Sequence, residues 1–109
     1  MSDISALQKE ALAFRDARDW AQFHNAKDLA AGLSIEASEL LECFLWKDAK
    51  SADPSKIREE LADVLVYALL FAHESKIDIP SAIREKLAKN ALKYPVEKAK
   101  GRSDKYDQL

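Results

Sequence analysis

The sequence predicts an all-α protein, a four-helix subunit that forms a helical bundle with another subunit. The 109 residues include only two Gly and three Pro and are 48% hydrophobic, a composition typical of a mostly helical globular domain. Apolar residues recur at helical spacing in four stretches. In the third stretch, residues 57–75, the part from Leu61 to Ala72 is apolar on nearly all sides. Such a helix is normally covered all round, so we expect another subunit to help cover it.

The first two helices are expected on either side of the Trp20 region. Ser2 or Asp3 is a suitable N-cap for the first helix, and its apolar pattern continues toward Trp20 and Phe23. The Asn25-x-x-Asp28 spacing resembles a capping box, which predicts the start of the second helix. Gly32 lies within that helix, where it costs about 1 kcal/mol relative to Ala. A close crossing with another helix would explain a glycine there.

The second half of the chain contains two more helices and a charged end. Residues 47–55 are a polar break, and Asp53-Pro54 predicts that a helix restarts there. A fourth helix is expected over Pro80–Tyr94, because proline is favoured in a first turn and Pro95 ends the pattern. The sequence therefore predicts one folded domain, residues 1–95, followed by a charged tail, residues 96–109.

Charge and hydropathy exclude several classes of function. The formal net charge is −2, so overall charge does not favour binding to a nucleic acid polymer. The longest apolar run, residues 64–72, is too short to span a bilayer, and residues 1–10 do not resemble a secretory leader. With a single cysteine, Cys43, the chain forms no internal disulfide. We expect a cytoplasmic protein without a membrane partner.

Two acidic runs lie in strongly apolar helical sequence, where carboxylates are costly to bury. The first run contains Glu36, Glu39 and Glu42, and the second contains Glu59, Glu60 and Asp63. Residues three apart share a helix face, and the short break predicts that the two helices pack as an antiparallel hairpin. The hairpin would place two carboxylate pairs opposite each other. Oxygen ligands without His or Cys suit Mg²⁺ or Mn²⁺.

Other interpretations of these runs stay open at this point. Glutamate pairs at helical spacing are common on solvated helix faces, but no Lys or Arg occurs within residues 36–42, and Asp63 lies in the most apolar segment. A di-iron carboxylate site would need Glu-x-x-His motifs, which are absent at Glu39 and Glu60. A helical oligomerisation or interaction module without catalysis is the alternative function, although it would not explain Asp63 or the Glu36 and Glu39 pair.

Several segments together resemble a known family. Glu36-x-x-Glu39-x-x-Glu42 followed by Glu60-x-x-Asp63 is similar to the signature of the MazG-like all-α nucleoside triphosphate pyrophosphohydrolases. The flanking segments are similar to the dCTP pyrophosphatase branch, and they comprise Arg18-Asp-Trp-Ala-Gln-Phe-His24, Phe44-Leu-Trp46, Glu60–Tyr67 and Lys93-Tyr-Pro95. The likeness extends from about Phe14 to Tyr106.

The resemblance implies a homodimer or homotetramer that hydrolyses a nucleoside triphosphate, such as dCTP or a related pyrimidine deoxynucleotide, to the monophosphate and pyrophosphate. Residues that match the Mg²⁺ ligands are Glu36, Glu39, Glu60 and Asp63. Residues that match the substrate site are Trp20 and Trp46 around the base, with Tyr67, Lys86 and Asn90 at the sugar and phosphates. The tail could complete the active site.

Two features of the predicted chemistry remain open. Lys93 belongs to a basic stretch of the fourth helix that could neutralise a triphosphate. Glu39, Glu42 and Glu59 are the candidates for activating the attacking water, and spacing does not choose among them. The chain departs from the animal enzymes at Ala11, where the resemblance leads us to expect a histidine, so a preference for cytosine does not follow.

Overall fold

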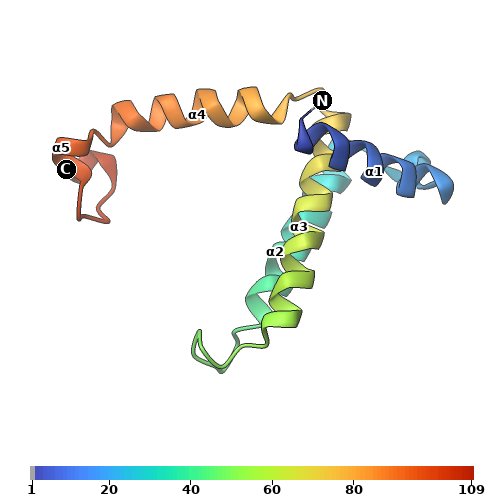
Figure 1. The fold of residues 1–109 in the computed structure, drawn as a ribbon, viewed down its shortest axis with the longest axis horizontal. Coiled ribbons are helices and arrows are strands. Elements are labelled where there is room, and N and C mark those ends of the chain that lie inside the picture. The colour runs from blue at the N-terminus through green and yellow to red at the C-terminus, as the bar shows by residue number, and fades with distance from the viewer. Residues whose placement is uncertain (1) are drawn as a thin grey trace. The chain divides into compact units, whose positions relative to one another are not determined.

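The computed structural model describes residues 2–109, and these residues form helices without any strand. The predicted all-α class is therefore confirmed. The chain forms two compact units, residues 1–77 and Asp78–Leu109 (Figure 1). The first unit contains α1 (Asp3–Ala17), the 3₁₀ helix η1 (Trp20–Phe23), α2 (Ala26–Glu42) and α3 (Pro54–Glu74). The second contains α4 (Ile79–Lys93), α5 (Val96–Ala99) and the 3₁₀ helix η2 (Tyr106–Gln108).

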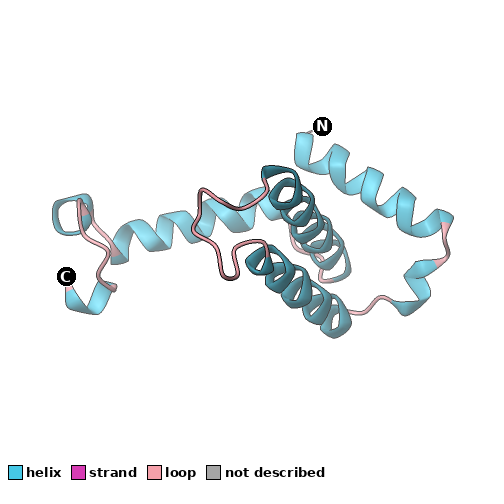
Figure 2. Ribbon diagram, turned by 90° about the horizontal axis from the view of Figure 1, so that it is seen from below, coloured by secondary structure: helices cyan, strands magenta, loops and turns pink. Residues whose placement is uncertain are grey.

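Helices α2 and α3 pack side by side as the antiparallel hairpin that the short break between them predicted (Figures 1 and 2). The Asn25 side chain accepts from the Asp28 amide at 2.9 Å and starts α2, and the Asp53 side chain accepts from the Ser55 amide at 3.0 Å and starts α3. Both caps satisfy otherwise unpaired amides of a first turn. Both predicted helix starts are thus confirmed.

Gly32 lies at a close crossing of these two helices. A methyl group on Gly32 would lie 2.3 Å from Cε1 of Tyr67 on α3, far inside van der Waals contact. The aromatic ring therefore occupies the space that any larger side chain at position 32 would need. This confirms that the glycine marks a close crossing, and it fixes the spacing of the two helices that carry the acidic runs.

Helix α1 ends earlier than its apolar pattern predicts. Asp19 adopts a left-handed conformation with φ 54°, which aspartate tolerates better than most residues. The Gln22 side chain donates to the Asp19 carbonyl and carboxylate, both at 3.0 Å. The expectation that one helix continues toward Phe23 is wrong at this turn, and Trp20 begins η1 instead.

Two polar contacts fasten α1 to α3. Arg15 is only 8% exposed, and its guanidinium donates to the Glu74 carboxylate at 3.1 Å and to its neighbour Asp16 at 2.9 Å. The Gln8 side chain donates to the Leu69 carbonyl at 2.9 Å. A buried charge requires such partners, so the ion pair defines where the C-terminal end of α1 meets the end of α3.

The second unit is a helix with a folded end. The Asp78 side chain accepts from the Ser81 amide at 3.1 Å, so α4 begins within a residue of the predicted start. The tail was predicted only as a charged segment, but Tyr106 packs edge-on against Tyr94 with centroids 6.1 Å apart. The Lys93 ammonium lies 4.9 Å from the centre of the Tyr106 ring. The tail thus folds back on the end of α4.

The chain buries few large side chains by itself. In the part that the structure describes, the buried apolar residues are Leu29, Ala52, Leu70 and Ala72. Large apolar residues of α3 that the sequence placed in a covered helix are exposed, including Leu61, Leu65 and Val66. Apolar exposure of this extent marks interaction surfaces in stable proteins. No helix among residues 2–109 has the length and apolarity needed to cross a membrane.

Candidate metal centre

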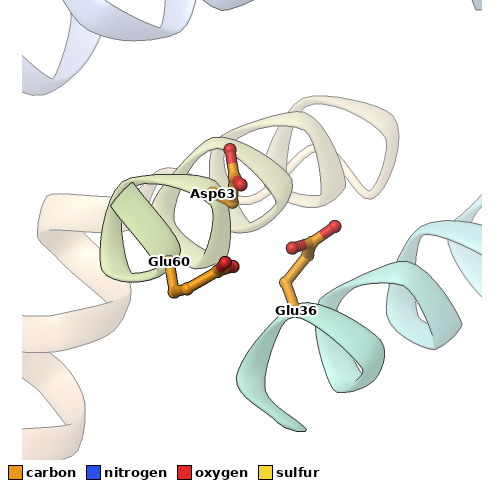
Figure 3. A group of neighbouring side chains, drawn as sticks. All are labelled: Glu36, Glu60 and Asp63. Atoms are coloured by element: carbon orange, nitrogen blue, oxygen red, sulfur yellow. The ribbon is translucent and has the colours of Figure 1, made fainter. Parts of the chain in front are cut away.

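Three carboxylates converge between α2 and α3. Figure 3 shows Glu36 projecting from α2 toward Glu60 and Asp63 of α3. Each residue offers an oxygen atom within 4.8 Å of the oxygens from the other two. Glu60 and Asp63 are three residues apart on one helix, and helical geometry places their side chains on the same face. The hairpin then brings Glu36 opposite them, as the sequence predicted.

Glu39 also belongs to this cluster, because neighbouring carboxylates shift its pKa. Hydrogen bonding to Glu36, followed by repulsion from the Glu36 charge, raises the pKa of Glu39. Burial raises the pKa of Glu60, and the nearby Glu39 charge raises it further. Like charges at short range disfavour ionisation of both groups. A bound cation would reverse this repulsion.

Two carboxylate oxygens in the cluster have no protein partner. Oε2 of Glu36 and Oε2 of Glu60 are buried and make no hydrogen bond in the described part of the chain. Buried polar atoms are normally satisfied, so these two oxygens are suited to bind a positive ligand. An all-carboxylate donor set suits a hard divalent cation such as Mg²⁺ or Mn²⁺. The residues therefore fit the group that the sequence predicted.

A polar cavity of about 330 Å³ opens on the Glu60 side of the cluster. Its carboxylates are Glu39, Glu42, Asp53 and Glu60, and its remaining lining consists of Cys43, Lys47 and Lys56. The two lysines were missed by the sequence analysis, which sought cations only in the fourth helix and the tail. The position of Lys56 could have been predicted from spacing, because Lys56 precedes Glu60 by four residues and shares its helix face.

An apolar groove of about 500 Å³ opens on the Asp63 side. It lies between α1 and α3, and its lining includes Leu7, Ala11, Phe14 and Val66 as well as Asp63. Phe14 packs edge-on against Trp20 with centroids 5.8 Å apart. Asp63 therefore separates an aromatic and apolar region from the acidic cluster, within one unit of the chain.

The other predicted site residues occupy varied positions. Tyr67 is half-buried against Gly32, one helical turn beyond Asp63. Trp46 has φ 63° and is fully exposed, and Glu59 is exposed outside both cavities. The remaining predicted substrate residues lie on α4 in the second unit, and they are Lys86, Asn90 and Lys93. The roles of all these residues stay predictions.

Comparisons with known proteins show the family to which this chain belongs. The MazG-like family matches residues 32–109. dCTP pyrophosphatase 1 from Homo sapiens is 35% identical over 117 aligned residues, which cover 100% of this chain and 67% of that protein. The Bos taurus dCTP pyrophosphatase 1 is 34% identical, with coverage of 100% and 68%.

A solved structure shows the same fold. The crystal structure of a pyrophosphatase from Archaeoglobus fulgidus superposes with a TM-score of 0.79 at 34% sequence identity, covering 87% of this chain and 94% of that one. The prediction of an enzyme of the nucleoside triphosphate pyrophosphatase class is confirmed by these relatives together. By its sequence match, its relatives and its fold, the chain belongs to the MazG-like family.

Proposed function

We propose that this chain hydrolyses a pyrimidine deoxynucleoside triphosphate, dCTP or a close relative, to the monophosphate and pyrophosphate in a Mg²⁺-dependent reaction. The observation that carries the proposal is the convergence of Glu36, Glu60 and Asp63, two of which hold unpartnered buried oxygens. The names of the relatives, dCTP pyrophosphatase 1, support the substrate class.

Glu36, Glu39, Glu60 and Asp63 would hold the cation. When bound, Mg²⁺ would supply electrostatic stabilisation for the charge that develops on the phosphoryl oxygens. The carboxylates would position the triphosphate through that cation. Their mutual repulsion disfavours the empty state at neutral pH, which strengthens cation binding.

Water must lose a proton as it attacks phosphorus and as the bond between the α- and β-phosphates breaks. We assign Glu39 as the acceptor of that proton, because it lies at the acidic cluster and lines the polar cavity beside it. Glu42 and Glu59 are the alternatives, and Glu42 lines the same polar cavity.

The apolar groove beside Asp63 suits the base, and Phe14 with Trp20 offers aromatic faces near it, which bind bases by stacking. We propose that Tyr67 contacts the sugar. Trp46, Lys86, Asn90, Lys93 and the tail, residues 96–109, would complete the site in a homodimer or homotetramer, whose formation would also cover the exposed apolar face of α3. Nucleotide-pool chemistry of this kind fits a cytoplasmic location.

The site assignment is tested by single substitutions in purified protein. Glu60→Gln and Asp63→Asn should each reduce kcat/KM by at least about 10²-fold, because each removes a carboxylate that would hold the cation. Glu59→Gln, an exposed neighbour outside both cavities, serves to separate the water-activating candidates. Asp3→Asn is the surface control, because Asp3 is exposed and lines neither cavity. Full activity in both Glu60→Gln and Asp63→Asn would overturn the assignment.

A further inference from the structure

Lys47 and Lys56 are the basic residues of the polar cavity, and they bracket the turn between α2 and α3. Lys47 follows the C-terminal end of α2, and Lys56 lies in the first turn of α3. Both side chains line the same cavity as Glu39 and Glu60. The hairpin therefore brings two ammonium groups, nine residues apart in sequence, to the edge of the acidic cluster.

Neither ammonium group is committed to a protein partner. Among residues 2–109, the ion pairs are Arg15–Asp16, Arg15–Glu74 and Arg102–Asp104, and none involves Lys47 or Lys56. Four carboxylates line the cavity with these two lysines, yet the lysines stay outside salt-bridge distance of all of them. Their donors are free for an anion that enters together with a divalent cation.

The two cavities beside the acidic cluster differ in the chemistry of their lining. The cavity at Glu60 carries charged groups, and the groove at Asp63 is mostly apolar and aromatic. A nucleotide also has one polyanionic end and one flat apolar end. Placing the base on the Asp63 side directs the phosphate chain past the carboxylates toward the two lysines.

We propose that Lys47 and Lys56 bind the β- and γ-phosphates, the part of the substrate that leaves as pyrophosphate, so that one unit of the chain holds both the cation and the leaving group. This inference rests on the proposed function for its orientation. Ammonium groups bind phosphates as point charges through short charge-assisted hydrogen bonds. A cavity of about 330 Å³ lies within the size range of small-ligand sites.

The test is the affinity of inorganic pyrophosphate in the presence of Mg²⁺, measured by isothermal titration calorimetry. Lys47→Gln and Lys56→Gln should each raise the Kd for pyrophosphate about tenfold, since a hydrogen bond to a charged group is worth about one such factor. The KM for the nucleotide should rise in parallel with a smaller change in kcat. Lys50→Gln in the same turn and Arg58→Gln on the same helix are controls, because neither residue lines the cavity.

A second measurement separates phosphate binding from simple neutralisation of the carboxylates. Lys56 lowers the pKa of Glu60 through its charge, so if that were its whole role, Lys56→Gln would change the affinity for Mg²⁺ and leave the affinity for pyrophosphate at saturating Mg²⁺ unchanged. Unchanged pyrophosphate affinity in the Lys47→Gln/Lys56→Gln double variant would overturn the inference.

The experiment also distinguishes failure of the inference from failure of the proposed function. Lysine-dependent pyrophosphate binding in a protein that turns over no nucleoside triphosphate would leave the anion site standing and remove the proposed reaction. Nucleotide turnover by the wild type, with a pyrophosphate affinity that does not depend on the lysines, would keep the proposed reaction and remove the anion site. Both lysines are exposed, so glutamine should leave thermal unfolding within the range of ordinary surface substitutions.

Discussion

Gly32 and Tyr67 are interlocked across the α2–α3 interface, because a Cβ at position 32 would lie 2.3 Å from Cε1 and 2.8 Å from Cδ1 of the tyrosine ring. The glycine allows the ring to approach α2 closely, one turn from Asp63. The contact therefore couples helix spacing to the position of a residue that we place beside the sugar.

The first prediction is a coupling free energy between these two residues. In the wild type, Gly32→Ala should improve helix propensity by about 1 kcal/mol. Displacement of the Tyr67 ring should cancel this gain in the free energy of unfolding. The KM for the nucleotide should rise several-fold. In a Tyr67→Ala background the ring is absent, and Gly32→Ala should stabilise the protein by the full propensity gain. A double-mutant cycle in urea measures the difference, and additive free energies would contradict the interlock.

The second prediction concerns the ion pair that joins α1 to α3. Glu74→Gln removes the carboxylate charge facing the buried Arg15 guanidinium, and it should lower the free energy of unfolding by about 1–3 kcal/mol. Asp16→Asn is the control, because the Asp16 side chain is 58% exposed and its loss should cost less. Chemical denaturation compares the two variants. Equal stabilities would show that the buried contact does not hold α1 in place.

The third prediction is a pH dependence with a defined sign. Folding raises the pKa values of Glu39 and Glu60, so the folded protein binds their protons more tightly than the unfolded chain. Their contribution favours folding below about pH 4.5, the ordinary glutamate value, and is lost as the pH rises through the raised pKa values.

This contribution is measured as a difference between variants. Without divalent cations, Glu39→Gln should raise the Tm relative to wild type above the raised pKa values and less below them, because it removes a repelling charge beside Glu36, Glu42 and Glu60. Added Mg²⁺ should raise the wild-type Tm most at the higher pH. Asp48 and Asp78, whose pKa values are lowered by serine partners, affect both proteins equally and cancel. A variant less stable than wild type at high pH without metal would contradict the repulsion.

The fourth prediction concerns assembly. Leu61 and Leu65 are exposed on α3, although the apolar composition of this helix is typical of a helix covered on all sides. We therefore expect sedimentation velocity to show a dimer or tetramer. Leu61→Glu should shift the species toward the monomer, because a buried charge in an apolar interface is costly. Asp3→Asn, an exposed substitution outside both cavities, should leave the assembly unchanged. A monomeric wild type at micromolar concentration would contradict the proposed oligomer.

The acidic cluster could be predicted from sequence because spacing on a helix fixes the face on which a side chain lies. The three-residue spacing alone predicts that Glu60 and Asp63 share a helix face. The short connection between the helices, which forces a hairpin, predicts that Glu36 lies opposite them. The close crossing at Gly32 followed from the cost of glycine inside a helix. These inferences depend on local geometry, which the sequence encodes directly.

Features that depend on the path of irregular backbone were not predicted. The left-handed Asp19 ends α1 although the apolar pattern continues, because a side-chain contact from Gln22 stabilises the turn. The convergence of Lys47 with Lys56 depends on the course of the turn between two helices, which periodicity does not describe. The fold of the tail against Tyr94 is likewise set by tertiary packing.

The central claim is most directly tested by identifying the products formed with Mg²⁺ from the eight standard nucleoside triphosphates, dUTP and 5-methyl-dCTP. Phosphorus NMR separates monophosphate plus pyrophosphate from diphosphate plus phosphate. The account predicts Mg²⁺-dependent formation of monophosphate and pyrophosphate, with pyrimidine deoxynucleotides turned over fastest. Absence of turnover with every nucleotide, in protein shown to be folded, would contradict it and favour a helical interaction module.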